Sequence, residues 1–233
     1  MATTINKQRL LNQVLSVLNE ADREEALPVL QQFIFGLCRE SATAEQARQA
    51  YHNLSEQFFD WNEVRVSSVR ELEEALAGLG DTESRAQRLL SFLQEVFETT
   101  FSFDLDTLQK KGLKQAAKQL SRYGSANDYV CSWVVQRALG GHAIPVDAPT
   151  LRCTRRLGLL EAEDEGEEAR AALEHLVPKA KGPQFTDAIS QIAEEYCWED
   201  EPNCAACPLA RDCATAQDNG EALTARPART KPR

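Results

Sequence analysis

Apolar side chains recur at every third or fourth position along most of the chain, and polar side chains fill the positions between them. This spacing places the apolar residues on one side of an α-helix, which can then pack against a core. Helices are predicted over residues 5–20, from Pro28, from Thr43, and over 69–79, 82–99, 104–122, 130–139, 168–176 and 184–196. Strict alternation of apolar and polar residues, which would indicate β-strands, is almost absent, so we expect an all-α fold.

Glycines and short polar residues mark where these helices end or begin. Residues 123–128 are typical of a turn, and Gly140-Gly141 fits a left-handed helix end. Residues 143–146 are the one stretch that we expect to be extended. Asp147 follows, and its carboxylate is well placed to accept hydrogen bonds from the first amides of a new helix. The sequence therefore predicts a helix cap at Asp147.

Composition limits the classes of function. The 233 residues are 42% hydrophobic, enough to bury the core of one domain or of two small lobes. The formal net charge of −10 has the wrong sign for a protein that binds nucleic acid over its whole surface, so such a contact needs a local basic patch. No apolar run reaches the length of a membrane span, and the first residues lack the apolar core of a signal peptide. We expect no membrane partner and a cytoplasmic or nucleoid-associated protein.

Four cysteines near the end of the chain form the strongest chemical pattern in the sequence. Cys197, Cys204, Cys207 and Cys213 are spaced C-x6-C-x2-C-x5-C, close enough for one compact centre to collect all four thiols. The other three cysteines are scattered singly through apolar surroundings; they are Cys38, Cys131 and Cys153. This contrast indicates that the four clustered thiols act together.

Three kinds of centre compete for these thiols. Disulfides rank last, because nothing in the sequence marks a secreted protein and cytosolic thiols are normally reduced. Structural zinc accepts four thiolates, but usually as two C-x2-4-C pairs, and here only Cys204 and Cys207 make such a pair. An iron-sulfur cluster ranks first, since a cubane is larger than one ion and tolerates more irregular loops. The residues alone leave all three open.

The cysteine spacing resembles the 4Fe-4S loop of endonuclease III, a member of the helix-hairpin-helix DNA glycosylase superfamily. Ile144-Pro145-Val146-Asp147 is similar to the same family's Gly/Pro-rich loop, which ends in the catalytic aspartate. The resemblance covers residues 28–215 and implies a 4Fe-4S cluster on the four clustered cysteines. It also implies two helical lobes with a cleft between them.

By this resemblance, residues 28–141 form a helical-barrel lobe that contains the hairpin, and residues 142–215 form the cluster lobe. Residues 1–27 would contribute a helix that packs on the cluster lobe. Residues 216–233 are polar, with two prolines and several basic residues, and we expect a disordered tail there.

The implied function is removal of a damaged or mispaired base from double-stranded DNA in base-excision repair, by a protein that we expect to be a monomer. Breaking an N-glycosidic bond builds positive charge on the sugar, and a nearby carboxylate stabilises that charge. The resemblance gives this role to Asp147. From the residues alone, a plain helix cap is the simpler interpretation of Asp147.

Several positions depart from the family's pattern. The hairpin keeps only its second glycine, Gly124, after Leu120-Ser121-Arg122-Tyr123. The position of the lysine that forms a Schiff base in bifunctional members holds Tyr129 or Ala126, depending on the alignment, so lyase chemistry is not expected. Glu40 or Ser41 replaces the glutamine that fills the gap left by a flipped base. Between the first two cysteines, Glu199, Asp200 and Glu201 would repel DNA phosphates.

Basic residues stand against these departures. Lys110, Lys114, Lys118 and Arg122 recur every four residues and would share one face of the predicted helix over 104–122, joined by Lys111, and Arg152 follows Asp147 on the next helix. They could form a phosphate track together with the hairpin amide of Gly124, or a plain solvated face. Two other functions therefore stay open. One is a catalytically inactive relative that serves as a nucleic-acid or protein binding module, and the other is a zinc-bound interaction protein.

Overall fold

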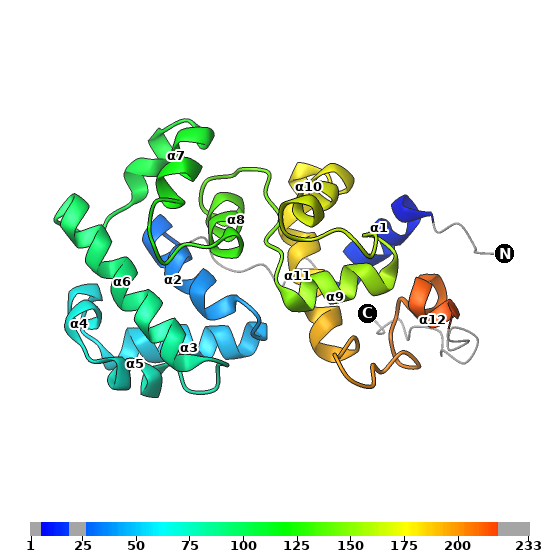
Figure 1. Ribbon diagram of the computed structural model, residues 1–233, viewed down its shortest axis with the longest axis horizontal. Coiled ribbons are helices and arrows are strands. Elements are labelled where there is room, and N and C mark those ends of the chain that lie inside the picture. The colour runs from blue at the N-terminus through cyan, green and yellow to red at the C-terminus, as the bar shows by residue number, and fades with distance from the viewer. Residues whose placement is uncertain (1–5, 19–26, 219–233) are drawn as a thin grey trace, which may run out of the picture. The chain divides into compact units, whose positions relative to one another are not determined.

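The computed structural model describes residues 6–18 and 27–218, and every regular element in these two ranges is a helix. The predicted all-α fold is confirmed (Figure 1). The chain divides into two compact units, one of Glu25–Pro145 and the other of Met1–Glu24 with Val146–Arg233. They are called the central unit and the terminal unit below, and each is described by itself.

The central unit contains seven α-helices and one 3-10 turn among its described residues. In chain order they are α2 (Val29–Arg39), α3 (Ala44–Gln57), α4 (Trp61–Val66), α5 (Val69–Ala75), α6 (Thr82–Thr100), η2 (Asp106–Lys110), α7 (Leu113–Leu120) and α8 (Asp128–Arg137). The described part of the terminal unit contains α1 (Lys7–Leu15), α9 (Ala148–Leu157), α10 (Gly166–Leu176), η3 (Lys179–Lys181), α11 (Gly182–Glu195), η4 (Ala210–Asp212) and α12 (Ala214–Asp218).

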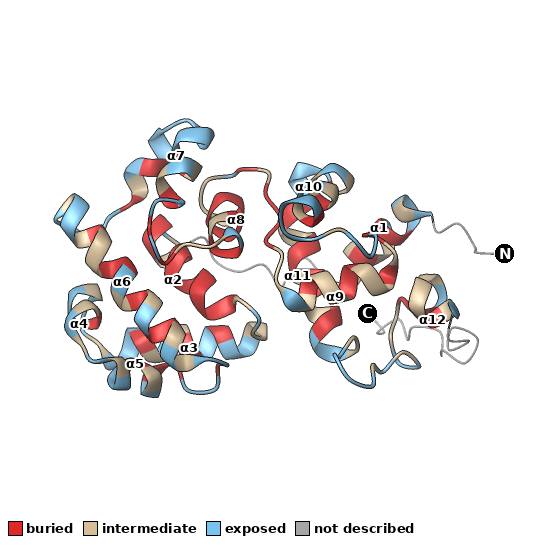
Figure 2. Ribbon diagram, in the orientation of Figure 1, coloured by how far each residue is buried: buried red, intermediate tan, exposed pale blue. Residues whose placement is uncertain are grey.

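Helix α2 forms the centre of the central unit, because ten of its eleven residues are buried (Figure 2). It packs against α3 on one side and α8 on the other. Phe33 stacks on Phe92 of α6 with ring centroids 3.6 Å apart, and Tyr123 meets both rings edge-on. Trp133 of α8 is fully buried, and its indole N–H donates to Gln32 Oε1 at 2.8 Å. Trp133 is therefore a core residue and does not stack on a ligand.

The helix starts follow from capping side chains. Thr43 and Ser68 each accept a hydrogen bond from the third amide of the following helix. In return, the side chains of Gln46 and Glu71 accept a hydrogen bond from the backbone amide of the cap residue. Asp147 caps α9, as predicted. Gly140 has a positive φ of 60° just after α8, which confirms the left-handed helix end predicted there.

One predicted helix is wrong in an instructive way. Residues 104–122 are not one continuous helix: the 3-10 turn η2 ends at Lys110, Lys111 is extended, and α7 begins only at Leu113, after its N-cap Gly112. Glycine is a poor helix former, because its backbone loses the most freedom on ordering. Lys110 therefore does not lie on the helix of Lys114 and Lys118, and Arg122 lies beyond the end of α7.

The terminal unit is built around α11. Helices α9 and α1 both pack against it, and Gln184 Nε2 of α11 donates to the Leu15 carbonyl at 2.7 Å. Of the tail that was expected to be disordered, residues 216–218 belong to helix α12, and residues 219–233 lie outside the described part of the chain. In the described ranges, no helix combines the length and apolar character that a membrane crossing needs.

We expect Trp133→Ala to lower the free energy of unfolding by about 3–5 kcal/mol, since it removes a fully buried ring and leaves a cavity. Urea denaturation followed by circular dichroism measures this loss. Phe59→Ala is the control, because the Phe59 ring is 94% exposed and its removal should change stability by less than about 0.5 kcal/mol. Equal effects of the two substitutions would contradict the assigned core.

Candidate functional site

The four clustered cysteines line one pocket of the terminal unit. Cys197 follows α11, Cys204 and Cys207 lie in the loop after it, and Cys213 precedes α12. A fifth thiol, that of Cys153 on α9, lines the same pocket and is fully buried. The pattern in the sequence identified four of these five thiols. Cys153 gave no signal, because a single cysteine outside any spaced group is also typical of an ordinary core position.

Two arginines of α9 hold the start of the cysteine loop. Arg152 donates from Nε to the Cys197 carbonyl at 2.9 Å. Arg156 donates to the carbonyls of Trp198 and Glu199, and its Nη1 lies 3.7 Å from Cys197 Sγ. The sequence predicts that Arg152 contacts DNA; in the structure, its Nε donates to this loop.

The thiols of this pocket differ in acidity. A hydrogen bond from Cys153 and then the nearby guanidinium of Arg156 lower the pKa of Cys197 to about 6, against the opposing effect of burial. Burial raises the pKa of Cys207 to about 11 and also raises that of Cys213. Because a metal-bound cysteine is a thiolate, binding at this pocket would release protons.

The arrangement of sulfurs bears on which centre they could form. The described residues contain no disulfide, and no group of three or more His, Cys, Asp or Glu side chains that could hold a metal ion is found among them. Zinc and an iron-sulfur cluster both bind four thiolates, and a pocket shared by the four clustered thiols is common to both kinds of centre.

Asp147 lies at the N-terminus of α9, the helix that carries Arg152 and Arg156. Its Oδ1 accepts a hydrogen bond from the Thr150 amide at 2.9 Å, and the side chain is partly exposed. The helix cap is confirmed. The partly exposed carboxylate is oriented by the first turn of α9, as a carboxylate that must meet a substrate would need to be.

The hairpin differs from its expected form. It comprises α7, the turn at residues 121–127 and α8. The Gly124 amide, which was expected to hold a DNA phosphate, donates to both carboxylate oxygens of Glu95 on α6, at 3.2 and 3.0 Å. In this structure a protein carboxylate takes the place of the expected phosphate. Sequence inspection could not reveal this pair, because Glu95 is 29 residues away along the chain.

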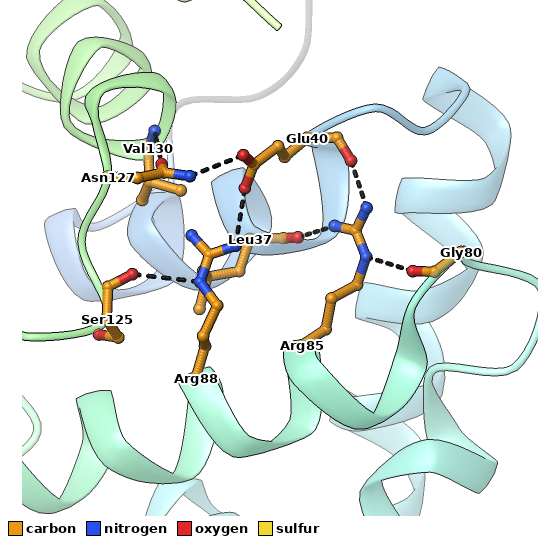
Figure 3. Close-up of polar contacts among 8 residues, drawn as sticks. All are labelled: Leu37, Glu40, Gly80, Arg85, Arg88, Ser125, Asn127 and Val130. Carbon is orange, nitrogen blue, oxygen red and sulfur yellow. Dashed lines mark hydrogen bonds and ion pairs between the residues drawn. The ribbon is translucent and has the colours of Figure 1, made fainter. Parts of the chain in front are cut away.

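Glu40 forms part of an internal network and does not point outward as a gap-filling residue would. Its carboxylate accepts hydrogen bonds from Arg88 Nη1 at 2.8 Å and from Asn127 Nδ2 at 2.6 Å (Figure 3). Arg88 also donates to the Ser125 carbonyl at 3.2 Å. The network ties the turn after α2 to the hairpin turn, so Ser41 is the residue left at the exposed tip.

Arg85 also stabilises the turn after α2. It is only 8% exposed and donates to the backbone carbonyls of Leu37, Glu40 and Gly80 (Figure 3). The residues that follow two of these carbonyls, Ser41 and Asp81, have left-handed φ values of 52° and 54°. Non-glycine residues rarely adopt this conformation, and its strain often marks functional loops. Arg85 thus holds two strained tips next to each other.

Neither candidate for the lyase position can act as an amine nucleophile. Tyr129 is buried and stacks on Trp133, and Ala126 is partly buried in the hairpin turn. Of the predicted basic stripe, Lys118 and Arg122 line a groove together with Lys111, Gln115 and Gln119. Lys110 and Lys114 do not line it.

Comparison with known proteins places this geometry in a familiar fold. The chain is 23% identical over 171 residues to the DNA glycosylase/AP lyase ROS1 and 27% identical over 192 residues to DEMETER-like protein 3, both of Arabidopsis thaliana. These matches cover 66% and 75% of the chain but only 12% and 18% of the plant proteins. No family model matches the sequence.

A solved structure of a trapped endonuclease III–DNA covalent intermediate superposes with a TM-score of 0.72 and 17% identity, over 93% of this chain and all of the other. The chain therefore has the endonuclease III-like fold. The resemblance first seen in the cysteine spacing and in the loop that ends at Asp147 is confirmed at the level of the fold.

We expect Glu40→Ala to lower stability by about 1.5–3 kcal/mol, because it leaves a largely buried guanidinium and an amide without their charged partner. Glu45→Ala removes a carboxylate from an exposed ion pair with Arg48 and should cost less than about 0.5 kcal/mol. Urea denaturation compares the two variants. If both lose the same small amount, the network does not brace the tip.

Proposed function

We propose that this chain is a DNA N-glycosylase of base-excision repair that removes a base without cutting the strand. The observation that carries the proposal is the endonuclease III-like fold with a partly exposed carboxylate, Asp147, fixed at the start of α9. A relative named DNA glycosylase/AP lyase supports the glycosylase part of this reaction.

Asp147 would stabilise the positive charge that develops on the sugar as the base departs. A preorganised carboxylate is effective here because it needs no reorganisation when the charge appears. Its bond to the Thr150 amide keeps it aligned, and the N-terminal end of α9 favours its ionised form. Water would then complete the hydrolysis.

The restriction to hydrolysis follows from the missing lysine. Strand cleavage by a lyase requires an amine that forms a Schiff base with the sugar. Tyr129 is held in the core, and Ala126 has no reactive group. The chain would therefore leave an intact strand with an abasic site.

We further propose that Cys197, Cys204, Cys207 and Cys213 hold a 4Fe-4S cluster. Their common pocket and the resemblance of their C-x6-C-x2-C-x5-C spacing to the 4Fe-4S loop of endonuclease III support it. When bound, the cluster would link the loop after α11 to the start of α12 through its cysteine ligands. Arg156 would hold the loop backbone around the first ligand and favour its thiolate.

Duplex DNA is the proposed partner, since endonuclease III is seen in complex with DNA in structures of the same fold. With a net charge of −10, the chain needs a local cationic surface for this contact.

A second function is favoured by one observation. Glu95 occupies the hairpin amide that would hold a phosphate in the family. A relative that has lost catalysis and serves as a binding module would tolerate such a change. The two functions differ in whether any base is released.

Excision assays on duplexes that carry uracil, oxidised pyrimidines or mispaired adenine test the proposal. Asp147→Asn keeps a good helix cap but removes the charge, so we expect excision to fall roughly 100-fold or more. Asp60→Asn, at the matching cap of α4, is the control and should keep full activity.

Excision that survives unchanged in Asp147→Asn would remove this carboxylate from the mechanism. Tight duplex binding without release of any base from a broad panel of lesions would favour the binding module.

A further inference from the structure

We propose that the phosphate-binding surface of the central unit is a groove on α7 lined by Lys111, Lys118 and Arg122, and not the hairpin amide at Gly124. The ligand class is a phosphodiester or polyphosphate chain, bound through its charge and not through its bases. The inference rests on the proposed function only in naming DNA as the natural ligand.

The hairpin amide is a poor phosphate site in this chain. Gly124 N–H already donates to the Glu95 carboxylate at 3.0 Å. Glu98 lines the same cavity as Glu95, so a second negative charge faces any anion that enters. A phosphate at Gly124 would have to displace the Glu95 carboxylate, since like charges at hydrogen-bond distance repel.

The groove has the opposite character. Its lining residues are Lys111, Gln115, Lys118, Gln119 and Arg122, with no acidic side chain among them. Gln115, Lys118 and Gln119 lie on α7, and Lys111 and Arg122 lie in the segments that flank it. The groove is open to solvent and has a volume of about 340 Å³, which is enough for a phosphate group.

The hydrogen bonding inside the groove also suits an anion. Lys111 Nζ donates to Gln119 Oε1 at 2.6 Å, which satisfies the acceptor of that amide and leaves its N–H groups as donors. Arg122 lines both this groove and the neighbouring cavity that holds Glu95. Arg122 therefore connects the groove to the cavity of Glu95, the residue that binds the hairpin amide.

The groove lining divides the basic residues of this region into two groups that an experiment can distinguish. The stripe read from the sequence included Lys110 and Lys114 on equal terms with Lys118 and Arg122. The structure leaves Lys110 on η2 and Lys114 outside the groove lining, although both are exposed. Only part of the stripe should therefore contact phosphate.

The test measures binding of the full chain to two probes over a range of salt concentrations. One probe is a duplex with a tetrahydrofuran abasic analogue, and the other is linear polyphosphate, which has no bases. Lys118→Gln and Arg122→Gln are compared with Lys114→Gln, which removes the same charge from the same helix. Excision is assayed separately.

For Lys118→Gln and for Arg122→Gln, we expect weaker binding of both probes and a decrease of roughly one in the slope of log K against log salt for the duplex. Lys114→Gln should leave the slope unchanged. If Lys114→Gln acts like Lys118→Gln, or if none of the three has an effect, the groove is overturned.

Two further outcomes separate this inference from the proposed function. If polyphosphate binds through the groove but the duplex does not bind at all, the proposed glycosylase function is wrong and the proposed phosphate site is retained. If neither probe binds, the proposed phosphate site is wrong. Glu95→Gln and Glu98→Gln should raise duplex affinity equally and slightly. A gain in Glu95→Gln that exceeds Glu98→Gln tenfold would place the phosphate on Gly124 and overturn the proposal.

Discussion

The hydrogen bonds between α9 and the cysteine loop are the interaction on which the terminal unit depends. Arg152 and Arg156 bind three successive backbone carbonyls, those of Cys197, Trp198 and Glu199. The same ten-residue helix begins at Asp147. One helix thus carries the proposed catalytic carboxylate at its start and the two arginines that bind the loop of the thiols.

In the central unit, arginines also stabilise loops through hydrogen bonds to backbone carbonyls. Arg85 and Arg88 donate to backbone carbonyls of turns, and the Glu40 carboxylate pairs with the charge of Arg88. This internal wiring keeps Ser41 and Asp81 in strained conformations at an exposed edge. It also takes Glu40 out of contact with any ligand. Glu95 does the same for the hairpin amide, so two positions that looked open in the sequence are already used inside the protein.

The sequence predicted what local patterns determine. Apolar spacing located most of the helices, and the polar residue before a new helix located the cap at Asp147. It failed where Gly112 interrupts an otherwise helical pattern, since the apolar spacing continues across the break. The site was only partly predictable for a related reason. The four clustered cysteines are close in sequence, whereas Glu95 with Gly124 and Glu40 with Asn127 are paired across 29 and 87 residues.

The account turns on whether the four clustered thiols bind one inorganic cluster. Iron and acid-labile sulfide, measured in the full chain purified without oxygen, test this directly. We predict about four of each per chain. A folded protein that contains no iron, or one zinc ion in its place, would contradict the account.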